Sequence, residues 1–235
     1  MRYSITKAAC YLGVAACTFW SCNQASRQDT HTVERDEKGE WITLIGQTLD
    51  QHWHTYLQDT VAGWEITDGV LSTPGKNGDL VSNDTFSNFE LEVEWKINEG
   101  GNSGIFYYVV EDPKYKRMYE TGPEFQLIDD TGYPQALTPA QKTGSLSDVI
   151  APDTAAANPP GSWNQTKIVV NEGRAEHWLN GQLILTYELG TPEWEKMVAA
   201  SKFADLDYGL TRSGRIGIQD HGDAVYFRNI RIRRL

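Results

Sequence analysis

Cysteine is scarce in this chain and confined to one end of it. All 3 Cys among the 235 residues, Cys10, Cys17 and Cys22, lie close to the N-terminus. The sequence that follows them offers no disulfide, no thiol nucleophile and no cysteine-ligated metal. A fold built from that part of the chain must be stable through its hydrophobic core alone, and about 195 residues are enough to build such a core.

Positive charge and long apolar runs are also in short supply. The chain has 21 Lys and Arg against 32 Asp and Glu, which gives a net charge of −11. Binding to nucleic acid or to anionic lipid requires a basic face, and this balance argues against one. Beyond the extreme N-terminus, no apolar run approaches the roughly 18 residues that a membrane-spanning helix needs.

The N-terminus has the pattern of a secretory signal. Arg2 and Lys7 precede an apolar stretch at residues 8–20, and a polar run follows. This arrangement predicts a signal peptide over residues 1–21 that is absent from the mature protein. Its removal would take away two basic residues and no acid, so the remaining chain is more negative still.

The end of this signal resembles that of a bacterial lipoprotein, and it favours Cys22 as the lipidated residue. Cys17 is the alternative, and an uncleaved anchor or a simple secreted protein also remains open. Residues 22–39 are polar without a hydrophobic period, which predicts a flexible tether. We therefore expect a lipid-anchored protein of the cell envelope, periplasmic or outer-membrane facing, that contacts the membrane through its N-terminal lipid only.

Short runs with the two-residue alternation of β-strands fill the chain from Trp41 onward. Turns rich in Gly, Asn or Pro separate them. About ten strands at such spacing predict an all-β, antiparallel β-sandwich, here as a single domain over residues 40–235. The expected strands are residues 64–66, 79–82, 89–97, 104–110, 124–128, 163–171, 175–179, 183–189, 215–219 and 225–234.

Two further segments depart from the strand pattern. Residues 191–203 predict one short surface helix, with Thr191 as N-cap and Pro192 at its first position. Residues 129–162 form a connection rich in Pro, Thr, Ala and Gly that is too long for an ordinary hairpin. Connections of this length in compact domains are often functional.

The stretch around Glu124 is the most informative for chemistry. In a strand, Glu124 and Gln126 share one face and leave Phe125 for the core. Retaining endoglucanases on related sandwiches use Glu-x-Asp-x-x-Glu, in which two carboxylates about 5 Å apart act as nucleophile and acid/base. Here the middle acid is an amide and the last acid is the shorter Asp129. Glu124 alone remains a candidate general base or acid, with an exposed glutamate on a wet strand as the alternative.

A second candidate lies where residues 219–223 read Gln-Asp-His-Gly-Asp. His221 beside Asp220 suggests an oriented acid/base pair or a metal ligand, although the same residues also make an ordinary turn. Several other aspartates offer oxygen ligands without the spacing of a specific calcium loop. A divalent cation is therefore left open, with no ligand set assigned.

The chain also carries a series of spaced motifs. They are WITL at 41–44, GNSGIF at 101–106, EFQLID at 124–129, TGSL at 143–146, WN at 163–164, EHWLNG at 176–181, SKF at 201–203, IQDHG at 218–222 and FRNI at 227–230. In this order, over roughly residues 40–235, they resemble the 3-keto-disaccharide hydrolase family. That family was once called domain of unknown function 1080 and includes 3-keto-glucoside lyases and 3-keto-2-hydroxyglucal hydratases.

The resemblance implies a concanavalin A-like jelly roll that acts on glycosides already oxidised at C3. The ketone acidifies the C2 proton, so a base can remove it and expel the C1 substituent, after which water adds to the glycal. Such a site needs a base near C2, a donor or metal at the ketone and an acid for the leaving oxygen. The resemblance points to Glu124 and His221 for catalysis, with Asp220 orienting.

The same resemblance suggests the residues that hold substrate hydroxyls or the ketone. They are Gln126, Asn102, His177, Lys142 and Tyr108. For His177, on a strand that ends in the Asn180-Gly181 hairpin, a structural role is an equal alternative. The family often has Tyr where this chain has Ser147, and a basic residue where it has Tyr108. The expected ligand is a 3-keto-glycoside or another carbohydrate. A non-catalytic carbohydrate-binding domain and, less favoured, an ordinary glycoside hydrolase are the alternatives.

Overall fold

The computed structural model describes residues 39–235, together with Met1. The predicted signal peptide, the predicted lipidation site Cys22 and most of the predicted tether lie outside the described residues. Within the described part, no helix is long and apolar enough to cross a membrane.

Two antiparallel sheets make up the described chain. The larger contains, in spatial order, β11 (Gln182–Glu188), β10 (Arg174–Leu179), β9 (Asn164–Asn171), β6 (Phe89–Ile97), β13 (Val225–Arg234), β4 (Val70–Thr73) and β3 (Glu65–Thr67), with β1 (Ile42–Thr43) paired to β13. The smaller contains β2 (Trp53–Thr55), β5 (Leu80–Phe86), β12 (Gly214–Ile218), β7 (Asn102–Val109) and β8 (Glu124–Ile128). The predicted all-β sandwich is confirmed.

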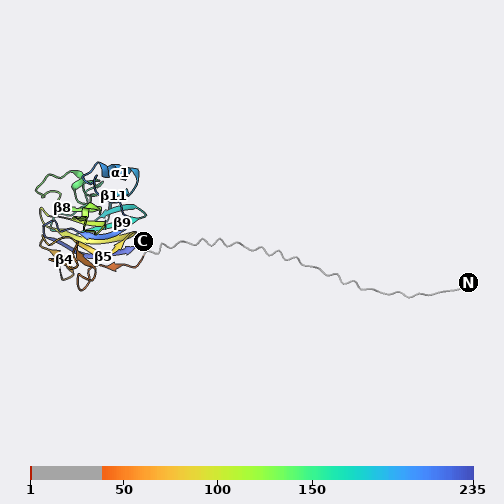
Figure 1. The fold of residues 1–235 in the computed structure, drawn as a ribbon, viewed down its shortest axis with the longest axis horizontal. Coiled ribbons are helices and arrows are strands. Elements are labelled where there is room, and N and C mark those ends of the chain that lie inside the picture. Colours follow the sequence, from red (N-terminus) through yellow and green to blue (C-terminus); the bar gives the residue numbers. More distant parts are fainter. Residues whose placement is uncertain (2–38) are drawn as a thin grey trace. The chain divides into compact units, whose positions relative to one another are not determined.

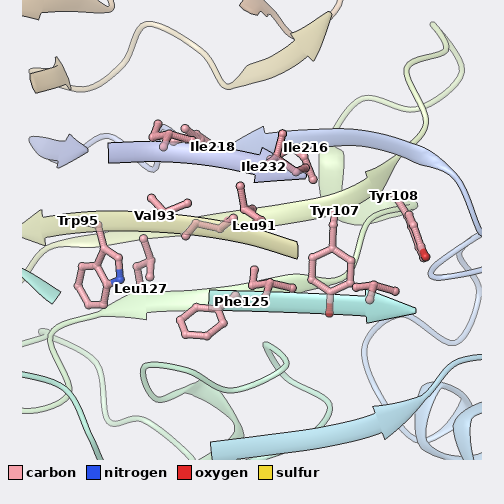
Figure 2. Packing of buried hydrophobic residues seen from close by; sticks show 14 of the residues in the cluster. Leu91, Val93, Trp95, Tyr107, Tyr108, Phe125, Leu127, Ile216, Ile218 and Ile232 are labelled. Atoms are coloured by element: carbon pink, nitrogen blue, oxygen red, sulfur yellow. The ribbon is translucent and has the colours of Figure 1, made fainter. Parts of the chain in front are cut away.

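The core lies between these sheets because alternate residues of each strand point inward. Leu91, Val93 and Trp95 of β6 pack with inward residues of the smaller sheet such as Phe125 and Leu127 (Figure 2). All five side chains are almost fully buried. Alternation therefore leaves Glu124 and Gln126 of β8 on the outer face of the smaller sheet.

The outer face of the larger sheet is charged, as the alternation in β6 predicts. Three glutamates of β6 lie opposite three arginines of β13 and form ion pairs with them. The pairs are Glu94 with Arg228, Glu92 with Arg231 and Glu90 with Arg233.

The α-helix of the described residues, α1 (Pro192–Ala199), begins as predicted and ends earlier than predicted. The Thr191 hydroxyl accepts a hydrogen bond from the Trp194 amide, which caps the helix. Trp194 is buried and anchors the helix to the sandwich. Figure 1 shows α1 beyond β11, at the end of the domain opposite β4. Two short 3₁₀ helices, η1 (Met118–Glu120) and η2 (Pro139–Gln141), lie in the connections beside β8.

Candidate active site

A pocket of about 320 Å³ opens on the outer face of the smaller sheet, over β7 and β8. This volume is at the lower end of the range for small-molecule sites, about 300–1,000 Å³. Asn102, Glu124, Gln126 and Ile128 form its floor. The connection after β8, predicted to be functional, supplies one wall through residues such as Tyr133 and Gln141.

Glu124 is the buried acid of this pocket, with only 6% of its surface exposed. Burial raises the pKa of its carboxyl group to about 8, while the nearby Lys202 ammonium and a hydrogen bond with Ser147 act against the increase. The carboxyl group therefore takes up or releases a proton close to neutral pH. That property suits a general acid or base.

Gly104 makes room for this carboxyl group. It lies on β7 next to Gln126 of β8, and a Cβ at this position would come within 2.1 Å of Glu124 Oε1. A distance that short is a severe clash, so every other residue type would displace the carboxyl group. The orientation of Glu124 thus depends on a glycine of the neighbouring strand.

Asn102 and Gln126 hold their amide groups in different ways. Gln126 Nε2 donates to Ser147 Oγ at 3.3 Å, and its Oε1 accepts from the Leu127 amide. Asn102 Nδ2 donates to the Tyr133 hydroxyl at 3.4 Å, and Asn102 Oδ1 is buried with no hydrogen-bond partner in the described chain. A buried acceptor without a hydrogen bond costs free energy, so a ligand hydroxyl that donates to Asn102 Oδ1 would bind favourably.

The sequence pointed to no role for Lys202 or Asp148, and both line this pocket. The Lys202 ammonium forms an ion pair with Asp148 Oδ2, and Asp148 Oδ1 accepts from Gln141 Nε2 at 2.6 Å. Gln219, next to the predicted Asp220, lines the pocket as well. Lys202 did occur in a matched SKF motif, but nothing in that motif ties it to Asp148.

His221 reaches the pocket, whereas Asp220 turns away from it. His221 is exposed and lies in the pocket lining. The Asp220 carboxylate accepts hydrogen bonds from the backbone amides of Lys76, Asn77 and Gly222. It stabilises this turn rather than orienting His221, so the proposed Asp–His pair is not assembled.

His177, predicted to contact substrate, lies instead in the core. It is fully buried between its hydrogen-bond partners, the Tyr107 hydroxyl and the Gly144 carbonyl, each 3.0 Å away. Burial lowers the pKa of its imidazole to about 4. The ring is therefore neutral near pH 7, with Nδ1 donating to the carbonyl and Nε2 accepting from Tyr107.

Tyr108 and Lys142 are also separate from the pocket. Tyr108 is buried, and its hydroxyl donates to the Ser87 carbonyl at 2.6 Å. Its side chain belongs to the hydrophobic core, since a left-handed backbone with φ of 58° interrupts the alternation of β7 at this residue. Lys142 is exposed after η2 and does not line the pocket.

Asp129, the counterpart of the second glycosidase carboxylate, is used for structure. Its oxygens accept hydrogen bonds from the backbone amides of Gly100, Thr131 and Gly132 and from the Thr131 hydroxyl. These bonds outweigh partial burial and lower the pKa of the carboxyl group. The Asp129 carboxylate therefore stays ionised and hydrogen-bonded to the backbone. It cannot serve as the second catalytic carboxylate beside Glu124 in a double displacement.

Beside the pocket, hydrophobic side chains cover the outer face of the smaller sheet. Tyr56, Val81, Phe106, Val109 and Met118 form a second hydrophobic cluster there. Met118, from η1, lies over Gly217 of β12, where a Cβ would come within 2.5 Å of its sulfur. The next residue, Tyr119, is 38% exposed and lines the pocket.

The structure leaves the divalent cation without an assigned ligand set. In the described part of the chain, no three His, Cys, Asp or Glu side chains are grouped so that they could hold a metal ion.

Comparison with known proteins gives a consistent set of similarities. Residues 40–233 match the family model described as a 3-keto-alpha-glucoside-1,2-lyase-like domain. The chain is 34% identical to a 3-keto-disaccharide hydrolase of Bacteroides thetaiotaomicron, over 89% of this chain and 83% of that protein.

Solved structures agree with this result. A crystal structure of a candidate glycosyl hydrolase from Parabacteroides distasonis is 37% identical, with a TM-score of 0.78 over 84% of this chain and 94% of that one. A Bacillus subtilis protein with a galectin-like fold is 15% identical, with a TM-score of 0.51 over 84% of this chain and 96% of that one. That second likeness concerns the fold alone.

Proposed function

The chain belongs to the family of 3-keto-alpha-glucoside-1,2-lyase-like domains, and we propose that it cleaves 3-keto-glycosides by β-elimination followed by hydration. The observation that carries this proposal is Glu124, a buried carboxyl group on the pocket floor whose pKa is raised to about 8. The relatives contribute the substrate class, since one of them is named a 3-keto-disaccharide hydrolase.

The reaction proceeds in two balanced steps. In the first, the Glu124 carboxylate accepts the C2 proton and leaves an enolate, and the enolate electron pair then forms the C1=C2 double bond as the C1–O bond breaks. The departing oxygen takes a proton from His221 at the edge of the pocket. In the second, His221 takes a proton from water as the hydroxyl adds at C1, and Glu124 returns its proton to C2, so both residues are restored and the net change is hydrolysis.

One active carboxyl group is sufficient for this route. A retaining glycosidase needs two carboxyl groups about 5 Å apart, one of them a nucleophile. Asp129 is bound to backbone amides, so it supplies no second group. Ionised Glu124 is the reactive form, and its fraction grows as the pH rises toward 8.

The test is release of 4-nitrophenol by the purified domain from the 3-keto-glucoside and from its unoxidised parent. We expect release from the keto form only, with kcat/KM rising toward pH 8 as Glu124 ionises, because 4-nitrophenolate leaves without needing a proton. Glu124→Gln should lower kcat about 10²–10⁴-fold, as expected when a general base is removed. Glu195→Gln, an exposed change on α1, is the matched control and should leave the rate unchanged.

Other outcomes separate the competing functions. Release from neither compound, with sugar binding retained, would indicate a carbohydrate-binding domain. Release from both would indicate an ordinary glycoside hydrolase. A parallel reaction with EDTA tests whether a divalent cation takes part.

A further inference from the structure

Lys202 is the only Lys or Arg among the described residues that line the pocket. It lies close enough to Glu124 for its charge to act on that carboxyl group. Of its three N–H donors, one is directed at Asp148, which leaves two for a ligand. The pocket therefore places a carboxyl group and an ammonium group within reach of one small ligand.

The ammonium group is positioned by its surroundings. Lys202 precedes Phe203, which is buried and stacks on Tyr208 with ring centroids 4.2 Å apart. Asp148, its ion-pair partner, has a left-handed backbone with φ of 59°. Its amide donates to the Ala140 carbonyl at 2.8 Å, and Gln141 donates to its second oxygen. Such backbone conformations persist only where neighbouring contacts impose them, and they cluster at functional sites.

Removal of a proton from C2 of a ketone sends negative charge to the C3 oxygen. A charge-assisted hydrogen bond to that oxygen is about twice as strong as a neutral one. Asn102 Oδ1 is an acceptor, and Gln126 Nε2, which uses one of its two N–H donors on Ser147, is a neutral donor. Asn102 Oδ1 can therefore receive a substrate hydroxyl but not the ketone, whereas Lys202 has the positive charge that strengthens a hydrogen bond to the ketone oxygen.

We propose that Lys202 is a catalytic residue that donates a hydrogen bond to the C3 oxygen, and that Asp148 is its positioning residue. This inference rests on the proposed function. The C2–H electron pair moves into the C2–C3 bond, the carbonyl pair moves onto oxygen, and the proton goes to Glu124. Lys202 keeps its own proton throughout. When the enolate collapses, the electron pair returns and expels the C1 oxygen.

The test compares Lys202→Met, Lys202→Arg and Asp148→Asn on the 4-nitrophenyl 3-keto-glucoside. Loss of one donor to a developing oxyanion costs about 10²–10³ in kcat. We expect that loss for Lys202→Met with KM within about 3-fold of wild type, a smaller loss for Lys202→Arg and an intermediate one for Asp148→Asn. Lys196→Met, an exposed lysine of α1 outside the pocket, is the matched control.

The split between kcat and KM decides the outcome. A Lys202→Met enzyme with unchanged kcat, or with its whole effect in KM, overturns the inference and leaves the proposed function standing. Wild-type enzyme that releases nothing from the keto substrate overturns both. The Lys202 side chain is 57% exposed, so its variants should fold. Thermal unfolding of each variant, Asp148→Asn included, confirms that the comparison is between folded proteins.

Discussion

At Glu124 the folded chain keeps a carboxyl group where only 6% of the residue is exposed. An ionised carboxylate in such a place loses its hydration, so the protonated form is favoured and the pKa rises to about 8. The same group in the unfolded chain has an ordinary pKa near 4.5. Between these two values the folded state holds a proton that the unfolded state has released.

This difference predicts how Glu124 affects stability. Its contribution is fully present below about pH 4.5 and is lost as the pH rises to 8, because the unfolded chain then binds fewer protons. Glu124→Gln removes the titration, and each pKa unit corresponds to about 1.4 kcal/mol. We expect the melting temperature of Glu124→Gln to exceed that of wild type by at least about 4 °C at pH 9, and by much less at pH 5.

Scanning calorimetry of both proteins at the two pH values checks this expectation. An equal difference at pH 5 and pH 9 would contradict the raised pKa of the folded state. Glu195→Gln again provides the control, because Glu195 is exposed on α1.

Sequence alone could predict Glu124 and Gln126 but not Lys202 and Asp148. Strand alternation over residues 124–128 places the first two on one face, and that is a local property. Lys202 and Asp148 are 54 residues apart and meet only after the connection following β8 has folded over the sheet. Asp and His are common catalytic residue types, so Asp220 and His177 were reasonable candidates. In the structure, however, the Asp220 carboxylate binds backbone amides and the His177 ring is hydrogen-bonded inside the core.

At the level of elements, β7 and β8 together form the floor of the pocket. Gly104 of β7 lies in register with Gln126 of β8, and Phe106 with Glu124. The strand register therefore decides which β7 residue lies under the carboxyl group. A glycine there lets the group lie across the neighbouring strand.

Gly104→Ala should impair catalysis more than folding. Gly104 does not have the left-handed backbone that favours glycine, so alanine fits the strand itself. Its Cβ, however, would lie 2.1 Å from Glu124 Oε1 and displace the carboxyl group. A displacement of about 1 Å in an active site can cost about 10²-fold, so we expect kcat to fall about 10–100-fold.

Steady-state kinetics and urea unfolding measure the two effects separately. A Gly104→Ala enzyme with wild-type kcat would mean that Glu124 is free to move without loss. The second change Glu124→Asp, which shortens the side chain, should relieve part of the clash in the Gly104→Ala background.

The strands that the sequence does not predict are all short, although β3, with three residues, was predicted. All ten predicted strands are present, and the cap of α1 is at Thr191 as expected. The strands that were missed, β1, β2 and β4, have two to four residues. Runs this short show little alternation, and β1 forms by pairing with a distant strand, as Ile42 pairs with Ile232.

On the scale of the whole molecule, His177 links the two sheets of the sandwich. It belongs to β10 of the larger sheet and bonds to Tyr107 of β7 in the smaller one, while its other nitrogen holds the Gly144 carbonyl. Burial lowers the pKa of the imidazole from 6.5 to about 4. The folded protein therefore excludes a proton that the unfolded chain accepts in mild acid.

His177→Gln should accordingly have a pH-dependent cost. The contribution of His177 is present above pH 6.5 and is lost as the pH falls toward 4. We expect the loss of stability caused by His177→Gln to be largest at pH 7 and to shrink by pH 5. Urea unfolding midpoints of the two proteins at both pH values give this difference, and a cost that does not change with pH would contradict the lowered pKa.

The packing of Met118 over Gly217 affects which carbohydrates can reach the pocket. A polysaccharide lying across the outer face would meet η1, whose Met118 is buried over Gly217 and whose Tyr119 is 38% exposed at the pocket. We expect a terminal sugar to enter the 320 Å³ pocket, and we expect η1 to keep a sugar in the middle of a chain away from Glu124. Under the proposed activity, the number of cleavable bonds in a sample therefore follows the number of chain ends and not the mass of polymer.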